Sequence, residues 1–393
     1  MPSITLGVSL AKAYQEARCH KRWKANTRQF SRRAEKNCRE LAENIGHRTY
    51  RISPSLCFIA DRPVKREIFA GDFRDRIIHH LVFDKLSPVY ERLFINDCYS
   101  CRKGRGTGYG IARAAHFLRA VTRNRTRPAW ILKLDISGYF MNIDRKRLYE
   151  KNRQLIRRFF PGETERMNEL FYLLRRIIFN DPTSDCRLRG RREDWHGLPV
   201  NKSLFSAAAG RGLPIGNLTS QLFGNVYLND FDHFVKERLK CRYYGRYVDD
   251  LLIFHESRTF LKNLIPKIED YLYAELGLRL HRRKIYLQPA SYGVQFLGAI
   301  IKPGRIYAAP RTVSNFREKI RQAATGQLDD SAFFNSYLGL LKKYNTFRLR
   351  QKIMTAPETQ AALSRLNLKV SQDFSAVTAA SPKLGTSRLI CTD

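Results

Sequence analysis

Acidic residues are scarce in this chain of 393 residues, which has 36 aspartates and glutamates against 71 lysines and arginines. The net charge of +35 is spread along the chain from Arg18 to Arg350 and is not confined to one tail. A fold this basic repels itself unless a polyanion neutralises it. The composition therefore favours nucleic acid as a partner, with binding that weakens steeply as salt rises.

Long apolar runs are also missing. No stretch reaches the length of a membrane-spanning helix, and no basic amphipathic helix stands out that could lie on a membrane surface. The first residues, MPSITLGVSLAKAYQEARCHKRW, lack the continuous apolar core and the cleavage site of a secretory signal. We therefore expect a cytoplasmic protein without a membrane partner.

The eight cysteines are scattered, and no internal repeat is visible. Cys98 and Cys101 form one CxxC, but a zinc site usually needs a second ligand pair at matching spacing. Cys186 and His196 are the candidates for that pair, and reduced cytoplasmic thiols are the favoured alternative. His79 and His80 diverge by about 100° if they lie on a helix, which favours structural roles over metal binding.

The apolar content of 43% suffices for two or three subdomains. Thr219 and Ser220 are candidate caps of a long helix that runs to about Leu239. Beyond about Asn367 the chain has no periodic apolar face, so we expect disorder there. The other expected strands lie at 56–60, at 129–136 and within 294–309, and an irregular polar insertion is expected at 181–212. Further helices are expected from 72, over 111–122, from 144, over 258–276, and within 311–352 with a break near 326.

Two carboxylates interrupt an apolar hairpin in YGRYVDDLLIFHES, residues 244–257. Asp249 and Asp250 are costly at a hairpin tip unless a cation lies beside them. A second apolar strand, ILKLD, ends in Asp135, so adjacent strands would bring the acids together at one sheet edge. Two Mg²⁺ ions about 4 Å apart would suit in-line displacement at phosphorus. A solvated surface pair is the alternative, and the flanking LLIF argues against it.

Seven segments, in order along residues 55–305, resemble the conserved boxes of reverse transcriptases. YVDD resembles the signature box, LKLDISGYF the box with the first metal-binding aspartate, and GLPIGNLTSQLFGNVYLN the box beneath the templating base pair. RPVKREIF and YSCRKGRGTG resemble two finger boxes, LGLRLHRRKIYL the palm segment with a lysine, and VQFLGAII the primer grip. The basic helices that follow occupy the place of the thumb.

The fourth box narrows the resemblance. Most retroviral and intron-encoded enzymes have glutamine after its Leu-Pro and proline after its serine, whereas this chain has Ile215 and Gln221. IGNLTSQ, together with FRDRIIHHL and KSLF, is similar to the reverse transcriptases of diversity-generating retroelements. We expect no RNase H, endonuclease or maturase module in a chain of this length.

The resemblance implies an α+β fold of the right-hand polymerase type, with fingers, a palm built on an antiparallel sheet and a short helical thumb. The implied division is a basic N-terminal extension at 1–54, mainly fingers at 55–134, palm with inserted elements at 135–305, thumb at 306–355 and a flexible tail at 356–393.

The resemblance also implies roles for single residues. Asp135, Asp249 and Asp250 match the catalytic triad and metal ligands, with two Mg²⁺ or Mn²⁺ ions as cofactors. Ile136 matches the position whose carbonyl ligates the nucleotide-bound metal. Phe140 matches the steric gate that rejects a ribose 2′-hydroxyl, with a core position as the alternative.

The basic residues of the finger and palm boxes match contacts to the incoming nucleotide. Arg66 aligns with the arginine that contacts the triphosphate, Lys65 assists it, and Arg102 is a second candidate. Such cations neutralise charge on the leaving pyrophosphate. Lys284 resembles the lysine proposed as proton donor to pyrophosphate. A solvated surface charge is the alternative for each finger residue.

Ile215 is the most informative departure from the family pattern. An aliphatic side chain cannot donate the hydrogen bond of the usual glutamine, and one such contact is worth about 1–2 kcal/mol, or roughly tenfold in error rate. We therefore predict low fidelity, and the resemblance implies misincorporation opposite template adenines. Gly216 and Gln221 are expected to bind the nucleotide together with Ile215. Gly216 lets the backbone approach the nucleotide because it has no Cβ, and Gln221 is the last residue of the variant motif IGNLTSQ.

The implied partners are a template RNA and its cDNA, dNTPs, and a basic oligomeric accessory variability protein. One alternative is another bacterial reverse transcriptase, of the retron or host-defence type, although retron enzymes usually lack IGNLTSQ. The other is a noncatalytic RNA-binding protein with a polymerase fold. The intact Asp135, Asp249 and Asp250 argue against it, because RNA binding alone has no use for buried acids.

Overall fold

The computed structural model describes residues 4–379 except 20, 62, 63, 161 and 163. The chain divides into two compact units, the first from residues 1–110 and 130–288 and the second from residues 111–129 and 289–393. Helices combine with mainly antiparallel sheets, so the expected α+β class is confirmed. Within the described ranges, no helix has the length and apolar character needed to cross a membrane.

The first unit is built on a four-stranded sheet in the order β5-β6-β3-β7. Its strands are β3 (Trp130–Asp135), β5 (Tyr243–Tyr247), β6 (Asp250–His255) and β7 (Tyr286–Pro289). β6 pairs antiparallel with both β3 and β5, and its four central residues are buried. This continuous apolar run fits a strand that is covered on both faces.

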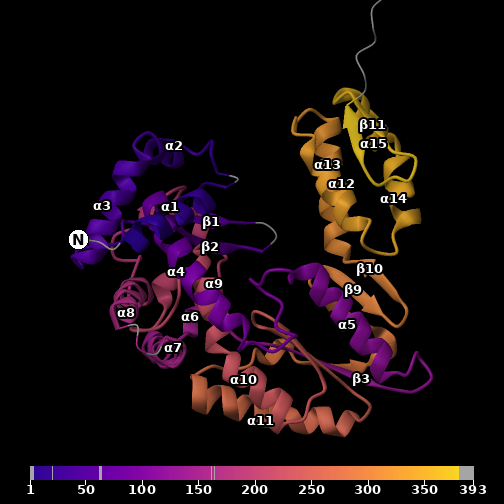
Figure 1. Cartoon of the computed structure of the whole chain (residues 1–393). Helices are drawn as coiled ribbons and strands as arrows, with labels where there is room; N and C mark the ends of the chain where they lie inside the picture. The colour runs from indigo at the N-terminus through magenta and orange to yellow at the C-terminus, as the bar shows by residue number, and fades with distance from the viewer. Residues whose placement is uncertain (1–3, 20, 62–63, 161, 163, 380–393) are drawn as a thin grey trace, which may run out of the picture. The chain divides into compact units, whose positions relative to one another are not determined.

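Helices of the first unit share one apolar core with this sheet, and α11 contacts β3 and β6 and lies below β3 in the view of Figure 1. Three begin at a side-chain cap: Asp72 accepts a bond from Arg74 N, Asp144 from Arg147 N, and Ser257 from Phe260 N. The helices are α1 (Ile4–Arg18), α2 (Ala25–Ser31), α3 (Ala34–Gly46), α4 (Phe73–Glu91), α6 (Tyr139–Asn142), α7 (Arg145–Phe159), α8 (Thr164–Ile178), α9 (Leu218–Tyr227), α10 (Asn229–His233) and α11 (Arg258–Leu276), with a π-helical segment η4 (Phe234–Arg238) and a short 3₁₀ turn η5 (Arg282–Lys284).

Within the first unit, a smaller sheet in the order β2-β1-β4 joins the polar insertion to β1. Its strands are β1 (Leu56–Ala60), β2 (Arg66–Ala70) and β4 (Arg187–Leu188), and the insertion adds 3₁₀ turns η1 (Arg192–Trp195), η2 (Val200–Lys202) and η3 (Leu204–Ser206). Glu67 of β2 is buried and accepts bonds from Trp195 Nε1 at 2.7 Å, Ser203 Oγ at 2.9 Å and Leu204 N at 2.6 Å. This buried carboxylate therefore ties the insertion to β2.

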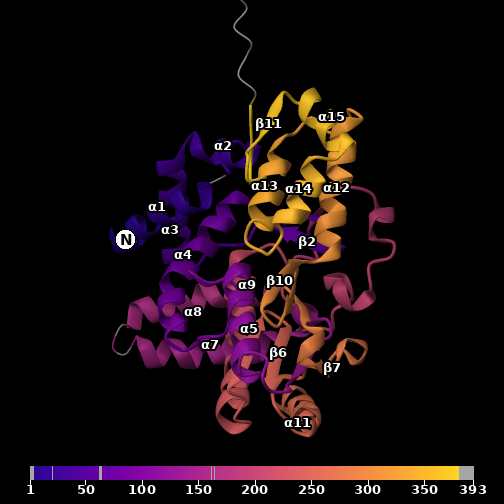
Figure 2. The ribbon, with the colours of Figure 1, turned by 90° about the vertical axis from the view of Figure 1, so that its right-hand side faces the viewer.

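The second unit has its own apolar core, formed by one face of its helices. α5 (Thr107–Val121) begins in the first unit and lies mainly in the second. A sheet in the order β10-β9-β8 precedes four helices and a hairpin, which lie side by side in both views (Figure 2). The elements are η6 (Ala290–Tyr292), β8 (Val294–Phe296), β9 (Ala299–Lys302), β10 (Arg305–Ala308), α12 (Pro310–Ala324), α13 (Ala332–Leu341), α14 (Phe347–Met354), α15 (Pro357–Arg365), β11 (Leu368–Val370) and β12 (Val377–Ala379).

Three expectations are corrected. The long helix predicted to Leu239 breaks after Tyr227 into α9, α10 and η4. Thr219 is not a cap, because its hydroxyl contacts the buried His79 Nδ1 at 2.7 Å, and α9 begins without a side-chain cap. The predicted flexible tail contains α15 and the β11–β12 hairpin, which pack on the second core through Leu363 and Val377. The expected disorder at residues 380–393 lies outside the described residues.

Candidate active site

The antiparallel register brings the three predicted acids together. Asp135 ends β3 directly opposite Asp250, which begins β6. Residues so paired have Cα atoms about 4.5–5.5 Å apart. Tyr247 pairs with Asp250 on the other side, so Val248 and Asp249 alone form the turn between β5 and β6. All three carboxylates therefore lie at one edge of the sheet, as the strand pattern predicted.

Backbone bonds fix the surroundings of this edge. Ile136 N donates to the carbonyl of Asp249 at 3.3 Å, and His281 N donates to that of Asp135 at 2.8 Å. The segment that carries Lys284 is thus fastened beside β3, and Lys284 Nζ contacts Asp135 Oδ2 at 2.9 Å. The structure thus places Ile136 and Lys284 beside the acids, and the roles that the resemblance implies for them stay predictions.

The electrostatics of the site are those of crowded negative charge. Burial, followed by the charges of Asp135 and Asp250, raises the pKa of Asp249 to about 6. Burial also raises the pKa of Asp250, although Lys133 opposes this from 3.3 Å. Like charges confined to a low-dielectric site favour a bound cation.

Carboxylate oxygens are the ligands that Mg²⁺ and Mn²⁺ prefer, so the donor set fits these ions. In the part of the chain that the structure describes, no three His, Cys, Asp or Glu side chains are gathered closely enough to hold an ion. Asp135 and Asp250 are instead paired with Lys284 and Lys133. A metal ion at these acids would compete with the two ammonium groups for Asp135 Oδ2 and Asp250 Oδ1. The CxxC of Cys98 and Cys101 likewise belongs to no such ligand group, and both are free thiols.

The residues predicted to contact the nucleotide's sugar and base share one apolar cluster. Phe140 in α6 and Ile215 both pack against a small core of Cys57, Phe69, Met141 and Leu204. Phe140 is half-buried, so the gate and core interpretations both describe its position. A Cβ at Gly224 of α9 would lie 3.3 Å from the Phe140 ring, so the glycine lets this ring pack close to the helix.

The glycine after Ile215 is required by a neighbouring strand. Gly216 has φ +127°, and a Cβ there would lie 2.8 Å from the carbonyl oxygen of Phe69 in β2. Phe69 N in turn donates to the carbonyl of Ile215 at 2.8 Å. In the structure, the backbone of Gly216 closely approaches strand β2. The sequence argument had expected this glycine to let the backbone approach the nucleotide. Gln221 is exposed and contacts Cys101 of the glycine-rich loop.

The predicted triphosphate contacts have different surroundings. Arg66 begins β2 and is exposed. Burial raises the pKa of Tyr247, which pairs with Asp250, and the charge of Arg66 opposes this rise. Lys65 donates to the carbonyl of His196 at 2.7 Å and lies 3.7 Å from Asp61. Arg66 is thus the cation of this group that stands open to a ligand.

Arg102 requires a correction. Its side chain is only 4% exposed, and it is bound to Glu91 at 2.9 Å. It also donates to the carbonyls of Ile95 at 2.7 Å and Cys98 at 2.9 Å. A guanidinium with these partners holds the loop together and is not free to meet a triphosphate.

Two features escaped the sequence argument. Lys133, the Asp250 partner, is the one basic residue in the apolar strand ILKLD, and this unusual position was the available signal. The second is a fully buried ion pair of Arg246 and Asp232, and Arg246 also bonds to the carbonyl of Val248 in the turn. Arg246 lies two residues from Val248 in the quoted hairpin, but its partner in α10 could not be identified from spacing.

The N-terminal helices form an arginine-lined cavity of about 660 Å³. Among the described residues, no acidic side chain lines it, and its wall contains Arg18, Arg22, Arg28 and Arg32. Trp23, next to Arg22, is 87% exposed. Cations beside an exposed aromatic ring suit single-stranded nucleic acid, whose phosphates and bases they contact.

Comparison with known proteins agrees with this geometry. Residues 65–301 match the family model described as reverse transcriptase (RNA-dependent DNA polymerase). The curated Protein YkfC of Escherichia coli (strain K12) is 24% identical over 288 residues, which cover 64% of this chain and 67% of that protein.

Solved structures with similarity include telomerase from Candida albicans in complex with a fragment of telomeric RNA, at 12% identity and a TM-score of 0.44, covering 82% of this chain and 56% of that one. Another is apo telomerase from Candida tropicalis truncated from its C-terminal domain, at 14% identity and a TM-score of 0.43, covering 70% and 60%. The chain thus spans under two thirds of these telomerases. The family match covers well over half of the chain, so the protein belongs to the reverse transcriptase family of RNA-directed DNA polymerases and has its polymerase fold.

Proposed function

We propose that this protein copies a retroelement template RNA into error-prone cDNA. The observation that carries the proposal is the register in which Asp135 faces Asp250 with Asp249 in the adjoining turn. We assign the three carboxylates to two Mg²⁺ ions, which when bound supply positive charge that activates the primer hydroxyl and steadies the phosphates. The carbonyl of Ile136 is a further ligand in this proposal.

The remaining site residues select and orient the nucleotide. Arg66, with Lys65 beside it, binds the triphosphate and offsets charge on the leaving group. Lys284, once released from Asp135, donates a proton to pyrophosphate. Phe140 excludes a ribose 2′-hydroxyl, so that dNTPs are incorporated.

Low fidelity follows from Ile215, with Gly216 and Gln221 completing the nucleotide-side segment. Isoleucine offers the nascent base pair no polar contact, and its packing against Phe69 and Met141 supports an apolar wall there. We propose that errors concentrate opposite template adenines and serve targeted protein diversification.

The proposed macromolecular partners are the template RNA, its cDNA and a basic oligomeric accessory protein. The arginine-lined cavity of α1 and α2 supports the RNA contact. A reducing cytoplasm is the proposed compartment, and the seven cysteines that the structure describes are all free thiols.

Primer extension on an RNA template tests the polymerase activity. The wild type should extend the primer with Mg²⁺, and the Asp249→Asn/Asp250→Asn double variant should not. Extension by both proteins, or by neither when native template and accessory protein are supplied, would favour a noncatalytic RNA-binding role.

Sequencing the cDNA tests the subtype. Ile215→Gln should lower the error rate at template adenines about tenfold, because it restores a contact worth about 1–2 kcal/mol. Ile215→Leu is the matched control, since it keeps the apolar character and volume. Unchanged or increased errors at adenines in Ile215→Gln would instead favour a retron or host-defence enzyme.

A further inference from the structure

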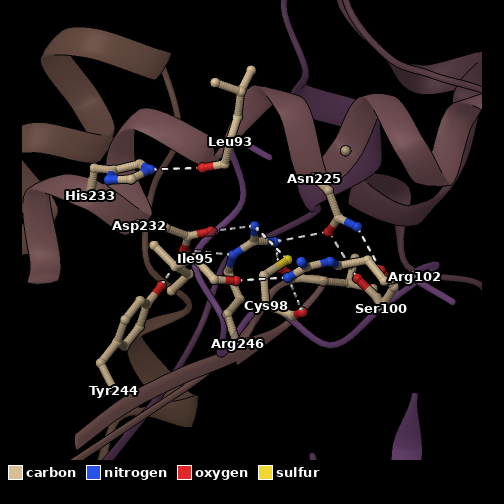
Figure 3. A network of polar contacts seen from close by, with 12 residues as sticks. Leu93, Ile95, Cys98, Ser100, Arg102, Asn225, Asp232, His233, Tyr244 and Arg246 are labelled. Atoms are coloured by element: carbon tan, nitrogen blue, oxygen red, sulfur yellow. Dashed lines mark hydrogen bonds and ion pairs between the residues drawn. The ribbon is translucent and has the colours of Figure 1, made fainter. Parts of the chain in front are cut away.

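Arg246 is a fully buried arginine in β5, two residues before the catalytic turn. A guanidinium has five N–H donors, and each has an acceptor here (Figure 3). Two of them form a fork on Asp232, with Nε at 2.8 Å and Nη2 at 2.6 Å from its oxygens. The other three reach Asn225 Oδ1 at 3.3 Å, Cys98 Sγ at 3.3 Å and the carbonyl of Val248 at 2.9 Å.

The contact to Val248 reaches the turn itself. Val248 has φ +57°, and Asp249 is not among the residues with positive φ, which is the pattern of a type II′ turn. Glycine is usual at this first position, and a β-branched residue there is a genuine outlier. Such strain persists only where the surroundings hold it. The Arg246 bond holds the peptide that joins Val248 to Asp249.

The far side of Arg246 is anchored in rigid structure. Asp232 is fully buried and also accepts a bond from Tyr244 Oη at 2.6 Å. Asn225 of α9 donates to the carbonyl of Ser100 at 2.7 Å and accepts from its hydroxyl at 2.8 Å. One guanidinium therefore joins two helices and the loop at 95–102 to the catalytic turn.

The main chain of Arg246 adds to this connection. Its N–H donates to the carbonyl of Asp97 at 2.8 Å, and its carbonyl accepts from Tyr99 N at 3.0 Å. Gly245 lies against the same loop, because a Cβ there would be 2.2 Å from Tyr99 Oη. These contacts fasten strand β5 to the loop two residues before the turn.

We propose that Arg246 is a positioning residue, which sets the conformation of the Val248–Asp249 turn and thereby the place of the Asp249 carboxylate for metal binding. The proposal rests on the polymerase function proposed above. A buried ion pair with only a structural role can be exchanged for apolar side chains at little cost in stability. Lysine cannot replace Arg246, because it has three donors on a single nitrogen and no planar fork.

The test uses the full chain with Arg246→Met/Asp232→Leu, which removes both charges together and replaces them with apolar volume. Partners behind a metal ligand typically change metal affinity or activity about 10–100-fold. We expect a loss of that size in Mg²⁺ affinity by titration calorimetry and in kcat for primer extension, with the KM for dNTP and the urea midpoint near those of the wild type. Tyr244→Phe is the matched control, since it removes a neighbouring bond to Asp232 and leaves every Arg246 donor in place.

Two further variants keep the test decisive if the double variant does not fold. Arg246→Lys retains the charge opposite Asp232 and should show the same loss of Mg²⁺ affinity. Adding Val248→Gly should restore part of it, because glycine adopts positive φ without strain. Unchanged Mg²⁺ affinity in both Arg246 variants, or a loss of kcat that Val248→Gly leaves unaltered, would overturn the positioning role. Mg²⁺ binding by a wild type that fails to extend primers would refute the polymerase function alone, and a wild type without Mg²⁺ binding would refute both.

Discussion

Asp249→Asn should stabilise the metal-free protein while abolishing its proposed activity. The pKa of Asp249 is raised from 3.8 to about 6, first by burial and then by Asp135 and Asp250. A shift of about two units corresponds to about 3 kcal/mol of unfavourable free energy for the charged form at pH 7.5. Asparagine has the same shape without the charge, so the variant avoids this cost.

The sign of the effect sets its pH dependence. A carboxyl with a raised pKa binds its proton more tightly when folded, so the metal-free wild type gains stability as pH falls through 6 toward 4. The advantage of Asp249→Asn should therefore be largest above pH 7 and shrink near pH 5. The gain expected at pH 7.5 is about 1–3 kcal/mol, since local relaxation relieves part of the repulsion.

Urea unfolding in EDTA measures this difference directly. Saturating Mg²⁺ should stabilise the wild type and leave the variant nearly unchanged, and primer extension by the variant should be lost. Asp270→Asn is the control, because Asp270 is an exposed residue of α11. A variant no more stable than the wild type in EDTA at pH 7.5 would refute the account of a site crowded with uncompensated charge.

Two further predictions concern other parts of the first unit. Burial lowers the pKa of His79 from 6.5 to about 4. The stability present above pH 6.5 should therefore fall by about 3 kcal/mol as pH falls toward 4. His79→Asn should flatten this pH dependence in urea unfolding, and an unchanged profile would contradict the prediction. Arg28→Gln/Arg32→Gln should weaken single-stranded RNA binding and reduce the slope of log affinity against log salt by roughly 1.4, as expected for two phosphate contacts. Arg157→Gln/Arg158→Gln, outside the cavity, should leave that slope unchanged in fluorescence anisotropy, and equal effects of the two pairs would contradict the site.

The elements that sequence predicted well are those whose signals are local. Asp72 and Asp144 cap α4 and α7 as the pattern of a polar residue before an apolar periodic run suggests. The strand that ends in Asp135 and the hairpin that carries Asp249 also followed from their apolar runs. Their convergence required only that two such strands be neighbours, which the register confirms.

The features that sequence did not predict depend on partners far along the chain. Arg102 was expected to contact the triphosphate. Only the fold shows that its guanidinium already donates hydrogen bonds to Glu91 and to two backbone carbonyls. The segment at 357–379 folds because α15 and the β11–β12 hairpin, through Leu363 and Val377, pack into a core made by earlier helices. A short hairpin without a periodic face gives no local sign of such packing.

In the proposed function, the residues for base selection and for sugar selection belong to one packing unit. Ile215 and Phe140 pack on the same four-residue core, and Phe69 N of that core also donates a hydrogen bond to the carbonyl of Ile215. Close-packed side chains transmit a change in volume to their neighbours. A polar residue at position 215 would therefore change the proposed wall of the base-pair site and also the packing around the Phe140 ring. An isoleucine there keeps the cluster wholly apolar, so the feature we connect with low fidelity is also one that holds the proposed sugar gate in place.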